Sequence, residues 1–481
     1  MSTLVAERPE NGVIVIFGAN GDLAKRKLLP GLYHLEVEGL LPEDFWVIGN
    51  ARSDISDGEF RALAREAVEE VNGGRLDETA WKRFADRLSF VSGSFAPGGT
   101  RDLERAVHAA EGAIGGQPRR LFYLSTPPPA FGPITEGLGA SGLAERSRVV
   151  YEKPFGMDLA SFEDLDRLVR GVLDEEQIYR IDHFLGKESV QNILALRFAN
   201  GMFEAMWNRD HIDHVQIDVP ESLGIGTRAG FYEKTGALRD MLVTHLFQVL
   251  SVVAMEPPSK LEQGPLIDEK VKVFESMRDL RPEDLVFGQY EGYPATEGVD
   301  PASRTETFVA ARVFIDNWRW DGVPFYLRTG KRMAAGRQTV TLAFRRPPAT
   351  MFRGVPRHGL DRDHLTMELG GDEGVALKFL VKEPGPGINL SPATMTFTYE
   401  QTFDSPLIDA YERLLLDALS GDRSLFTRAD GIGRTWEVVR CVFEDPPTVH
   451  PYPQGSWGPA AADDLIAPRR WHLPDGGDPH P

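Results

Sequence analysis

A short glycine-rich segment near the amino terminus constrains the possible fold more than any other feature. Residues 13–17 form a continuous apolar run, which is typical of a strand buried on both faces. The sequence Gly18-Ala19-Asn20-Gly21-Asp22-Leu23-Ala24 follows at once, and leucines in residues 27–38 recur at helical spacing. Glycines allow a tight turn and let phosphate oxygens approach backbone amides, and the positive end of the next helix faces such an anion. The segment predicts a dinucleotide-binding turn with these cofactor contacts: Gly18, Ala19, Asn20, Gly21, Asp22 and Leu23.

The residues after the second predicted strand indicate which dinucleotide fits. Residues 45–48 form that strand, and Gly49-Asn50-Ala51-Arg52 follow with no acid before Asp54. A carboxylate about 20 residues after the glycines binds the ribose hydroxyl of NAD, whereas a guanidinium pairs with the 2′-phosphate of NADP. Arg52 therefore favours NADP. Two alternatives stay open: the G-x-x-G-x-x-A spacing also fits an ordinary strand-to-helix turn, and Arg52 also fits a solvated surface position.

The pattern of apolar residues predicts two domains, as expected because 481 residues are too many for one ordinary core. In the first third, strands at 13–17, 45–48, 121–124 and 149–151 alternate with helices at 27–38 and 56–71. Such alternation predicts an α/β Rossmann-type doubly wound domain, which we assign to residues 1–178. Residues 179–481 are expected to form an α+β domain that binds substrate and mediates oligomerisation.

The second domain is expected to hold a large, mostly antiparallel sheet. Its predicted strands show the two-residue period of strands with one exposed face and lie at 215–219, 307–314, 339–344, 375–381 and 394–399. Its predicted helices are 189–203, 239–255 and 404–419. From residue 446 the chain is rich in proline, glycine and tryptophan, and we expect an ordered wrap that frays beyond residue 473.

Composition excludes several classes of protein. A formal net charge of -19 argues against nucleic acid as the partner, because phosphate backbones need a basic face. A single cysteine, Cys441, excludes a disulfide framework and favours a reducing, cytoplasmic location. The longest apolar run, at 246–255, is too short to span a membrane. Asp210-His211-Ile212-Asp213-His214 could hold a metal, but charged residues leading into a strand are the simpler interpretation, and we expect no metal.

Two further segments carry most of the functional information. They are Glu152-Lys153-Pro154-Phe155-Gly156 and Arg180-Ile181-Asp182-His183-Phe184-Leu185-Gly186-Lys187-Glu188. Together with the glycine turn they closely resemble the glucose-6-phosphate dehydrogenase family, and the likeness continues through residues 239–245, 324–331 and 455–459. The resemblance implies NADP-dependent oxidation of glucose 6-phosphate at C1 to the lactone, the first step of the oxidative pentose phosphate pathway.

The resemblance also implies roles for individual residues. Removing a hydride from C1 requires a base for the hydroxyl proton, and His245 matches the family's base, with Asp182 as the carboxylate that orients it. For an isolated histidine a core position would be commoner, but the matched segment 239–245 favours the base. The residues implied for substrate binding are Lys153, His183, Lys187, Glu221, Asp240 and Lys331, and Lys153 also lies near the nicotinamide. Lys25, Arg26 and Lys27 form a basic run, of which at least some belong to a solvated face, and Lys27 is a further candidate near the cofactor or substrate phosphate.

The sequence departs from the family at two positions. Phe184 stands where many members carry a tyrosine that donates to the substrate phosphate, and Gly336 stands where several carry a basic residue, although Arg337 is adjacent. We therefore expect His183 and Lys187 to be the main phosphate anchors and the phosphate affinity to be lower. Members of the family form homodimers or dimers of dimers, so a homodimer or homotetramer is expected.

Two rival functions fit part of the sequence. Sugar and inositol dehydrogenases also use a Glu-Lys-Pro segment, but they lack the Asp-His-x-Leu-Gly-Lys segment seen at 182–187. A catalytically silent sensor of NADP or sugar phosphate could keep the glycine turn and lose the base, but Asp182, His183, Lys187 and His245 are all present.

Overall fold

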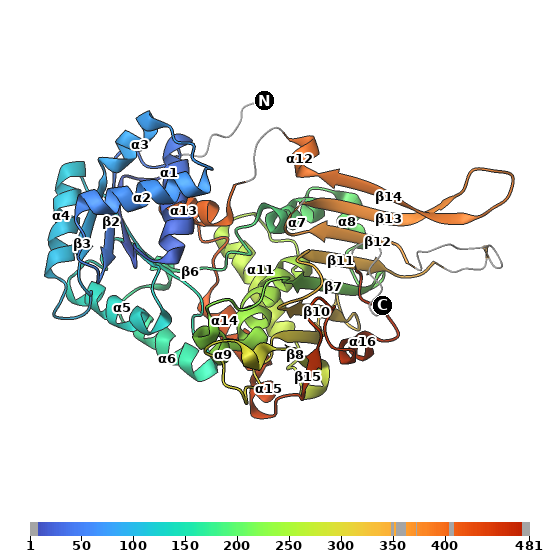
Figure 1. Ribbon diagram of the computed structural model, residues 1–481. Coiled ribbons are helices and arrows are strands. Elements are labelled where there is room, and N and C mark those ends of the chain that lie inside the picture. Colours follow the sequence, from blue (N-terminus) through green and yellow to red (C-terminus); the bar gives the residue numbers. More distant parts are fainter. Residues whose placement is uncertain (1–7, 348–350, 353–361, 372, 404–407, 474–481) are drawn as a thin grey trace. The chain divides into compact units, whose positions relative to one another are not determined.

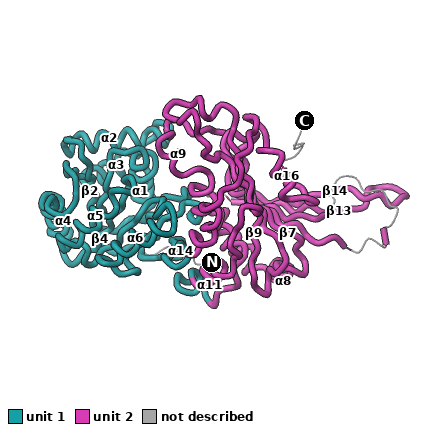
Figure 2. The backbone as a smooth tube through the Cα atoms, turned by 90° about the horizontal axis from the view of Figure 1, so that it is seen from below, with its two compact units in different colours: residues 1–186, 260–267, 408–433 teal, residues 187–259, 268–407, 434–481 magenta. Residues whose placement is uncertain are grey.

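The computed structural model describes residues 8–347, 351–352, 362–371, 373–403 and 408–473. The chain forms two compact units (Figure 2). Unit 1 comprises residues 1–186, 260–267 and 408–433, and unit 2 comprises 187–259, 268–407 and 434–481. The predicted boundary at 178/179 treats each domain as one continuous stretch, whereas unit 1 takes in two segments from later in the chain. That boundary stays a prediction.

The described strands of unit 1 form one six-stranded sheet in which every pairing is parallel. In spatial order they are β3 (Leu88–Ser92), β2 (Phe45–Ala51), β1 (Gly12–Phe17), β4 (Arg119–Leu124), β5 (Ser147–Tyr151) and β6 (Ile178–Arg180). The order reverses at β1, which is the switch point where doubly wound sheets bind ligands. The predicted Rossmann-type architecture is confirmed, although strands β3 and β6 were not predicted.

Helices connect these strands (Figure 1). They are η1 (Ala24–Leu28), α1 (Leu29–Val37), α2 (Asp57–Val71), α3 (Glu78–Ala85), α4 (Arg101–Ile114), η2 (Pro128–Ala130), α5 (Phe131–Ala140), α6 (Leu159–Arg170) and η3 (Glu175–Gln177). The predicted helix at 56–71 is confirmed, and its start follows from a capping box: Ser56 accepts from the Glu59 amide while Glu59 accepts from the Ser56 amide. Residues 24–28 adopt a π-helix rather than an α-helix.

A late segment of the chain completes unit 1. Helix α13 (Ala410–Ser420) packs on η1 and α1. A Cβ on Gly31 of α1 would lie 3.0 Å from Cγ of Glu412, so glycine permits the close approach of the two helices. The His34 Nδ1 lies 2.6 Å from the Glu412 carboxylate, which raises the pKa of His34 through that hydrogen bond. Beyond α13, the Thr427 amide donates to the Arg180 carbonyl at 3.1 Å.

The described strands of unit 2 form a nine-stranded sheet, predominantly antiparallel as predicted. In spatial order they are β14 (Leu390–Thr398), β13 (Gly374–Lys382), β12 (His364–Glu368), β11 (Thr339–Phe344), β7 (Ile212–Pro220), β10 (Phe325–Gly330), β9 (Phe308–Val313), β8 (Leu285–Tyr290) and β15 (Val449–Tyr452). Two pairs, β7 with β10 and β8 with β15, are parallel. Strands β7 and β10 lie in the middle of the sheet, whereas β8 and β15 lie at one edge.

The remaining helices follow β6 in the chain. They are α7 (Glu188–Phe198), α8 (Gly201–Met206), α9 (Ala229–Ala237), η4 (Leu238–Leu246), α10 (Phe247–Ala254), α11 (Gln263–Ser276), η5 (Pro282–Asp284), η6 (Tyr293–Ala295), α12 (Tyr399–Thr402), α14 (Ala429–Val438), α15 (Arg440–Glu444) and α16 (Ala461–Ile466). The run from Ala229 to Ala254 is long and apolar enough to cross a membrane, but 89% of its most apolar window is buried, as in a core helix.

Two predicted helices differ in extent from the structure. The single helix expected at 189–203 is two helices, because Asn200 is extended (φ −128°, ψ 103°) and interrupts the run. Of the helix expected at 404–419, residues 404–407 lie outside the described residues, and the helix itself begins at Ala410 after the Asp409 cap. The expected wrap contains β15 and α16, whereas the fraying expected beyond residue 473 lies outside the described residues.

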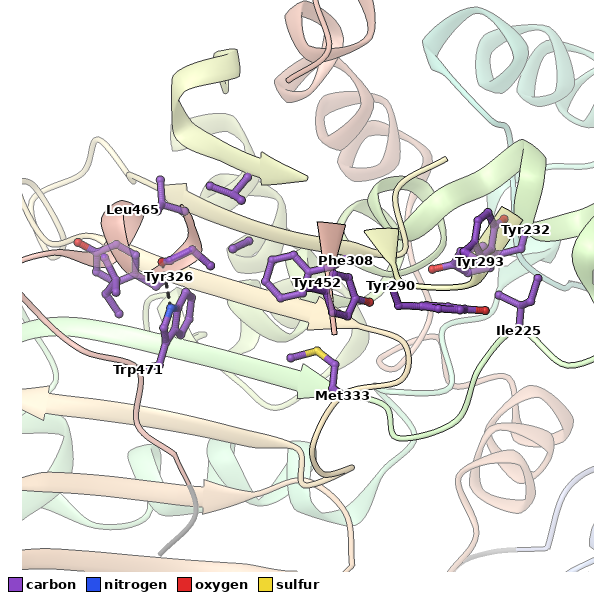
Figure 3. Packing of buried hydrophobic residues seen from close by; sticks show 14 of the residues in the cluster. Ile225, Tyr232, Tyr290, Tyr293, Phe308, Tyr326, Met333, Tyr452, Leu465 and Trp471 are labelled. Carbon is purple, nitrogen blue, oxygen red and sulfur yellow. Dashed lines mark hydrogen bonds between the residues drawn. The ribbon is translucent and has the colours of Figure 1, made fainter. Parts of the chain in front are cut away.

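An aromatic cluster packs where β8, β9, β10 and β15 meet (Figure 3). Phe308, Tyr290 and Tyr452 form its middle, and Tyr232 and Tyr293 extend it towards α9. The Tyr452 hydroxyl donates to the Lys331 carbonyl at 2.7 Å. The cluster thus fixes the backbone at the end of β10, where a predicted substrate residue stands.

Candidate functional site

A cavity of about 800 Å³ opens at the switch point of the unit 1 sheet. The cavity lies where four parallel strands end. Its lining includes Gly18 and Gly21 after β1, Arg52 after β2, Gly93 after β3 and Thr126 after β4. The carboxyl edge of a doubly wound sheet is the position where such folds bind dinucleotides. The geometry therefore provides a nucleotide-sized cavity around the predicted glycine turn.

Glycine is required at the first position of the turn. Gly18 has φ +77°, and a Cβ there would lie 2.2 Å from the Ser125 carbonyl oxygen at the end of β4. The Gly18 amide donates to the Asn50 carbonyl at 2.8 Å, and the Gly21 amide donates back to the Gly18 carbonyl at 2.9 Å. The turn is thereby hydrogen-bonded to the end of β2, and it lies close against the residue that follows β4.

The predicted cofactor residues divide into two groups. Gly18, Asn20, Gly21 and Arg52 line the cavity, and the Asn20 side chain donates to the Ser53 hydroxyl at 2.7 Å. The described cavity lining does not include the four others, which are Ala19, Asp22, Leu23 and Lys153. Ala19 is buried, and Asp22 pairs with Arg26 at 3.0 Å on the surface.

Sequence reasoning missed part of the cavity wall. Residues 93–96 and 125–127 line it, after β3 and β4 respectively. The small and proline residues that follow the apolar run 121–124 were a usable signal, because loops at this edge of a parallel sheet face the ligand. For residues 93–96 the signal was absent, since the preceding strand Leu88–Ser92 is only partly buried and two of its five residues are serines.

Lys153, Asp182 and His183 follow the last two strands of the same sheet. Lys153 comes two residues after β5, beside Glu152, which is buried and accepts from the Tyr123 hydroxyl at 2.6 Å. Burial raises the pKa of Glu152. After β6, the Asp182 carboxylate accepts from the Phe184 amide at 2.9 Å, and the His183 ring stacks on Tyr411 of α13 with centroids 6.0 Å apart.

Glu221 and Lys331 are brought together in unit 2. Each is the first residue after its strand, β7 and β10, and these strands run parallel with Pro220 opposite Gly330. The Lys331 ammonium donates to the Glu221 carboxylate and lies 5.6 Å from the centre of the Tyr232 ring. The Lys331 side chain is 4% exposed and the Glu221 side chain 32%, so the lysine is buried while its partner reaches the surface at the ends of these strands.

Asp240 and His245 share the buried π-helix η4. In a π-helix the hydrogen bonds run from i to i+5, and the Phe247 amide accordingly donates to the Leu242 carbonyl. This wider turn brings residues five apart closer to one side of the helix than an α-helix would. The Thr244 hydroxyl donates to the Arg239 carbonyl at 2.7 Å, the same separation of five. Because π-helices are rare and are found frequently at functional sites, η4 is notable.

The predicted phosphate anchors have polar partners in the structure. The Lys187 ammonium donates to Oε1 of Gln338 at 2.6 Å and to the Leu369 carbonyl at 3.0 Å. Arg337, the proposed substitute for a basic residue at Gly336, pairs with Glu368. Phe184 is 3% exposed, as expected of an apolar side chain in a core position. In unit 1, Lys27 pairs with Asp409 at 2.7 Å.

Comparison with known proteins identifies the family to which this chain belongs. Residues 15–192 match the profile of the glucose-6-phosphate dehydrogenase NAD binding domain, and residues 194–472 match that of the glucose-6-phosphate dehydrogenase C-terminal domain. The chain belongs to the glucose-6-phosphate dehydrogenase family. It is therefore an oxidoreductase with a domain for a nicotinamide dinucleotide.

Individual members of the glucose-6-phosphate dehydrogenase family agree over nearly the whole chain. The glucose-6-phosphate 1-dehydrogenase of Mycolicibacterium smegmatis is 43% identical over 486 residues, covering 95% of this chain and 97% of the relative. The crystal structure of the enzyme from Mycobacterium avium has a TM-score of 0.86 at 40% identity and covers 97% of this chain and 99% of that one. A glucose-6-phosphate dehydrogenase solved in complex with its substrate glucose-6-phosphate has a TM-score of 0.89 at 32% identity, with 98% and 100% coverage.

The glycine turn generates a test of the cavity. Gly18→Ala is expected to weaken binding of a nicotinamide dinucleotide at least about tenfold, because the new methyl would displace the end of β4. The measurement is a fluorescence titration of the folded protein with the dinucleotide. Gly116→Ala is the matched control, since Gly116 has a similar φ of +69° but open space around its Cβ position. Unchanged affinity in Gly18→Ala would show that the turn does not hold the cofactor.

Proposed function

We propose that this protein oxidises D-glucose 6-phosphate at C1 to 6-phospho-D-glucono-1,5-lactone, with NADP as the hydride acceptor. The observation that carries the proposal is the buried π-helix that holds both Asp240 and His245, in a chain about 40% identical to several glucose-6-phosphate 1-dehydrogenases. The reaction needs an acceptor for sugar hydroxyls, which Asp240 can supply, and a base for the C1 hydroxyl, which His245 can supply. The reaction would open the oxidative pentose phosphate pathway in the cytoplasm.

In the proposed mechanism His245 acts as the general base. Its neutral imidazole removes the proton of the C1 hydroxyl while the hydrogen on C1 leaves as hydride, so that the C1–O bond becomes a carbonyl. Asp182 is assigned the orienting role, because a carboxylate fixes the tautomer of the imidazole and stabilises the imidazolium that forms. NADP, when bound, supplies the electron-poor ring that takes up the hydride.

Charged side chains hold the substrate in this proposal. His183 and Lys187 are assigned to the phosphate, to which both can offer charge-assisted hydrogen bonds. Glu221 and Asp240 suit the sugar hydroxyls as acceptors, and Lys331 suits a sugar oxygen as a donor. The existing Lys331–Glu221 pair supports this assignment, because it preorganises a donor and an acceptor side by side. Lys153 is assigned to positioning the C1 hydroxyl near the nicotinamide.

The choice of NADP rests on Arg52. It lines the cavity after β2, where a carboxylate would mark an NAD enzyme. Neighbouring Ser53 adds a hydroxyl to the same stretch of the wall. We further propose that the protein acts as a homodimer or homotetramer, as the family resemblance implies.

The overall assignment can be tested in one assay. The protein is mixed with NADP and glucose 6-phosphate, and the absorbance of the reduced cofactor is followed, with glucose in a parallel reaction. We expect reduction with glucose 6-phosphate and a much lower kcat/KM with glucose, because the phosphate supplies binding energy through its charged contacts. Equal kcat/KM values for the two sugars would remove the sugar-phosphate assignment, and the absence of any reduction would favour a sensor.

Replacing the base tests the mechanism. His245→Asn is expected to lower kcat by about 100- to 10,000-fold, the contribution typical of a general base, while substrate still binds. Steady-state kinetics give kcat, and calorimetric titration with glucose 6-phosphate gives the affinity. His214→Asn serves as the control, because His214 is also a buried histidine of unit 2 but bonds to Asp213 at the start of β7. Near-normal turnover in His245→Asn would exclude this residue as the base.

Replacing Arg52 tests the choice of cofactor. Arg52→Ala is expected to raise KM for NADP by about tenfold or more, as expected when a charge-assisted contact is lost, and to leave KM for NAD nearly unchanged. Steady-state rates with each dinucleotide measure the effect. Arg26→Ala is the control, since Arg26 lies in η1 near the same turn and pairs with Asp22 on the surface. An equal rise for both dinucleotides would show that Arg52 does not read the 2′-phosphate.

A further inference from the structure

One carboxylate holds the start of the helix that carries Asp240 and His245. Glu306 lies two residues before β9, 68 residues away in sequence from the residue to which it bonds. Its Oε1 accepts from the Leu238 amide at 3.0 Å, and its own backbone carbonyl accepts from the Ala237 amide at 2.9 Å. The first amides of any helix have no partner inside the helix, so Glu306 supplies acceptors that η4 cannot provide for itself.

The backbone before η4 is shaped to admit this carboxylate. At Gly236 the chain leaves helical geometry, with φ +58° and ψ −176°, which separates α9 from η4. A Cβ at Gly236 would lie 2.1 Å from Oε1 of Glu306 and 2.5 Å from its Cδ. Glycine is therefore needed both for the left-handed conformation and for the space that the carboxylate occupies. The contact between Gly236 and Glu306 therefore sets the direction in which η4 leaves α9.

The same segment also reaches the other substrate residues of unit 2. Thr307 follows Glu306, and its carbonyl accepts from the Lys331 amide at 2.9 Å. The Thr307 hydroxyl lies 3.0 Å from the Tyr452 hydroxyl, which donates to the Lys331 carbonyl. Two consecutive residues thus bond to the start of η4 on one side and to Lys331 on the other. Burial raises the pKa of Glu306 to about 7, as expected for a carboxyl enclosed by these elements.

We propose that Glu306 is a positioning residue for the reaction, which sets the placement of Asp240 and His245 by accepting a hydrogen bond at the start of η4. The proposal rests on the proposed function for the roles of those two residues. Small displacements of a reacting group lower the reaction rate strongly. Loss of this bond should therefore lower kcat although Glu306 makes no contact with substrate.

The test compares variants of the full-length protein. In Glu306→Ala we expect kcat to fall about 10- to 100-fold and KM for glucose 6-phosphate to rise, because both residues on η4 shift. The dissociation constant for NADP should stay unchanged. Glu306→Gln should keep most of the activity, since the amide oxygen still accepts from Leu238. Hydrogen–deuterium exchange of residues 238–246 should rise in Glu306→Ala and stay near wild type in Glu306→Gln.

A matched control separates positioning from general stability. Glu233 is a carboxylate of α9 that accepts from the Tyr293 and Ser303 hydroxyls, at 2.6 and 2.8 Å, and does not cap η4. Glu233→Ala should therefore leave kcat and KM near wild type. If Glu306→Ala does not fold, Glu306→Asp serves instead, because a shorter side chain keeps the charge but draws the oxygen away from Leu238.

Several results would overturn the proposal. They are normal kcat and KM in folded Glu306→Ala or Glu306→Asp, equal losses in Glu306→Gln and Glu306→Ala, or the same loss in Glu233→Ala. Failure of the proposed function would be visible separately, as a wild-type protein that does not reduce NADP with glucose 6-phosphate. The exchange of residues 238–246 would still report whether Glu306 anchors η4 in that case.

Discussion

The parallel pairing of β7 with β10 determines where the substrate-side residues of unit 2 meet. Most neighbours in the nine-stranded sheet are antiparallel, and in such pairs one strand begins where the other ends. Because β7 and β10 run the same way, their carboxyl ends emerge together, and the residues that follow them are Glu221 and Lys331. The Glu221 amide donates to the Gly330 carbonyl at 2.9 Å, which closes the junction.

A buried ion pair fixes the register of these two strands. Arg328 donates to both oxygens of the Asp218 carboxylate, and each side chain stands opposite the other in the ladder. The Arg328 guanidinium also lies over the rings of Trp457 and Trp471, at 5.3 and 4.3 Å from their centres. A slip by one residue would turn every side chain of the strand to the opposite face and leave both charges buried without partners. The position of the Glu221–Lys331 pair therefore depends on this register.

Much of the fold could be predicted from sequence because its signals are local. The apolar run at 13–17 and the glycines after it, and the Ser56 capping box, act over a few residues. The predicted strands did not include β10, because all six of its residues are buried and show no two-residue period. Its parallel direction could not be predicted either, since an apolar pattern carries no information on the direction of the neighbouring strand. Likewise the break at Asn200 depends on one backbone conformation, and β6 has only three residues.

In the candidate site, too, residues with a local sequence signal were predicted, and residues placed by the fold were not. Gly18 and Gly21 were predicted from the turn and Arg52 from the end of the second predicted strand, and all three line the cavity. Residues 93–96 were missed, because their role follows from the place of β3 in the sheet and not from their chemistry. Lys27 was interpreted from its position in the first helix, but its partner Asp409 lies far away in sequence, where no local pattern could indicate it.

The return of residues 408–433 to unit 1 has a consequence for how the protein is made. Helix α13 covers the side of α1 that carries Gly31 and His34, and the Arg148 guanidinium donates to the Ala418 carbonyl at 3.0 Å, at the end of that helix. On the ribosome the six strands of the nucleotide-binding sheet emerge first, yet this surface stays uncovered until most of unit 2 has been translated. Domains generally fold as units, beginning with the amino-terminal one. Here the amino-terminal unit can form its sheet early, but it acquires its last helix only near the end of synthesis.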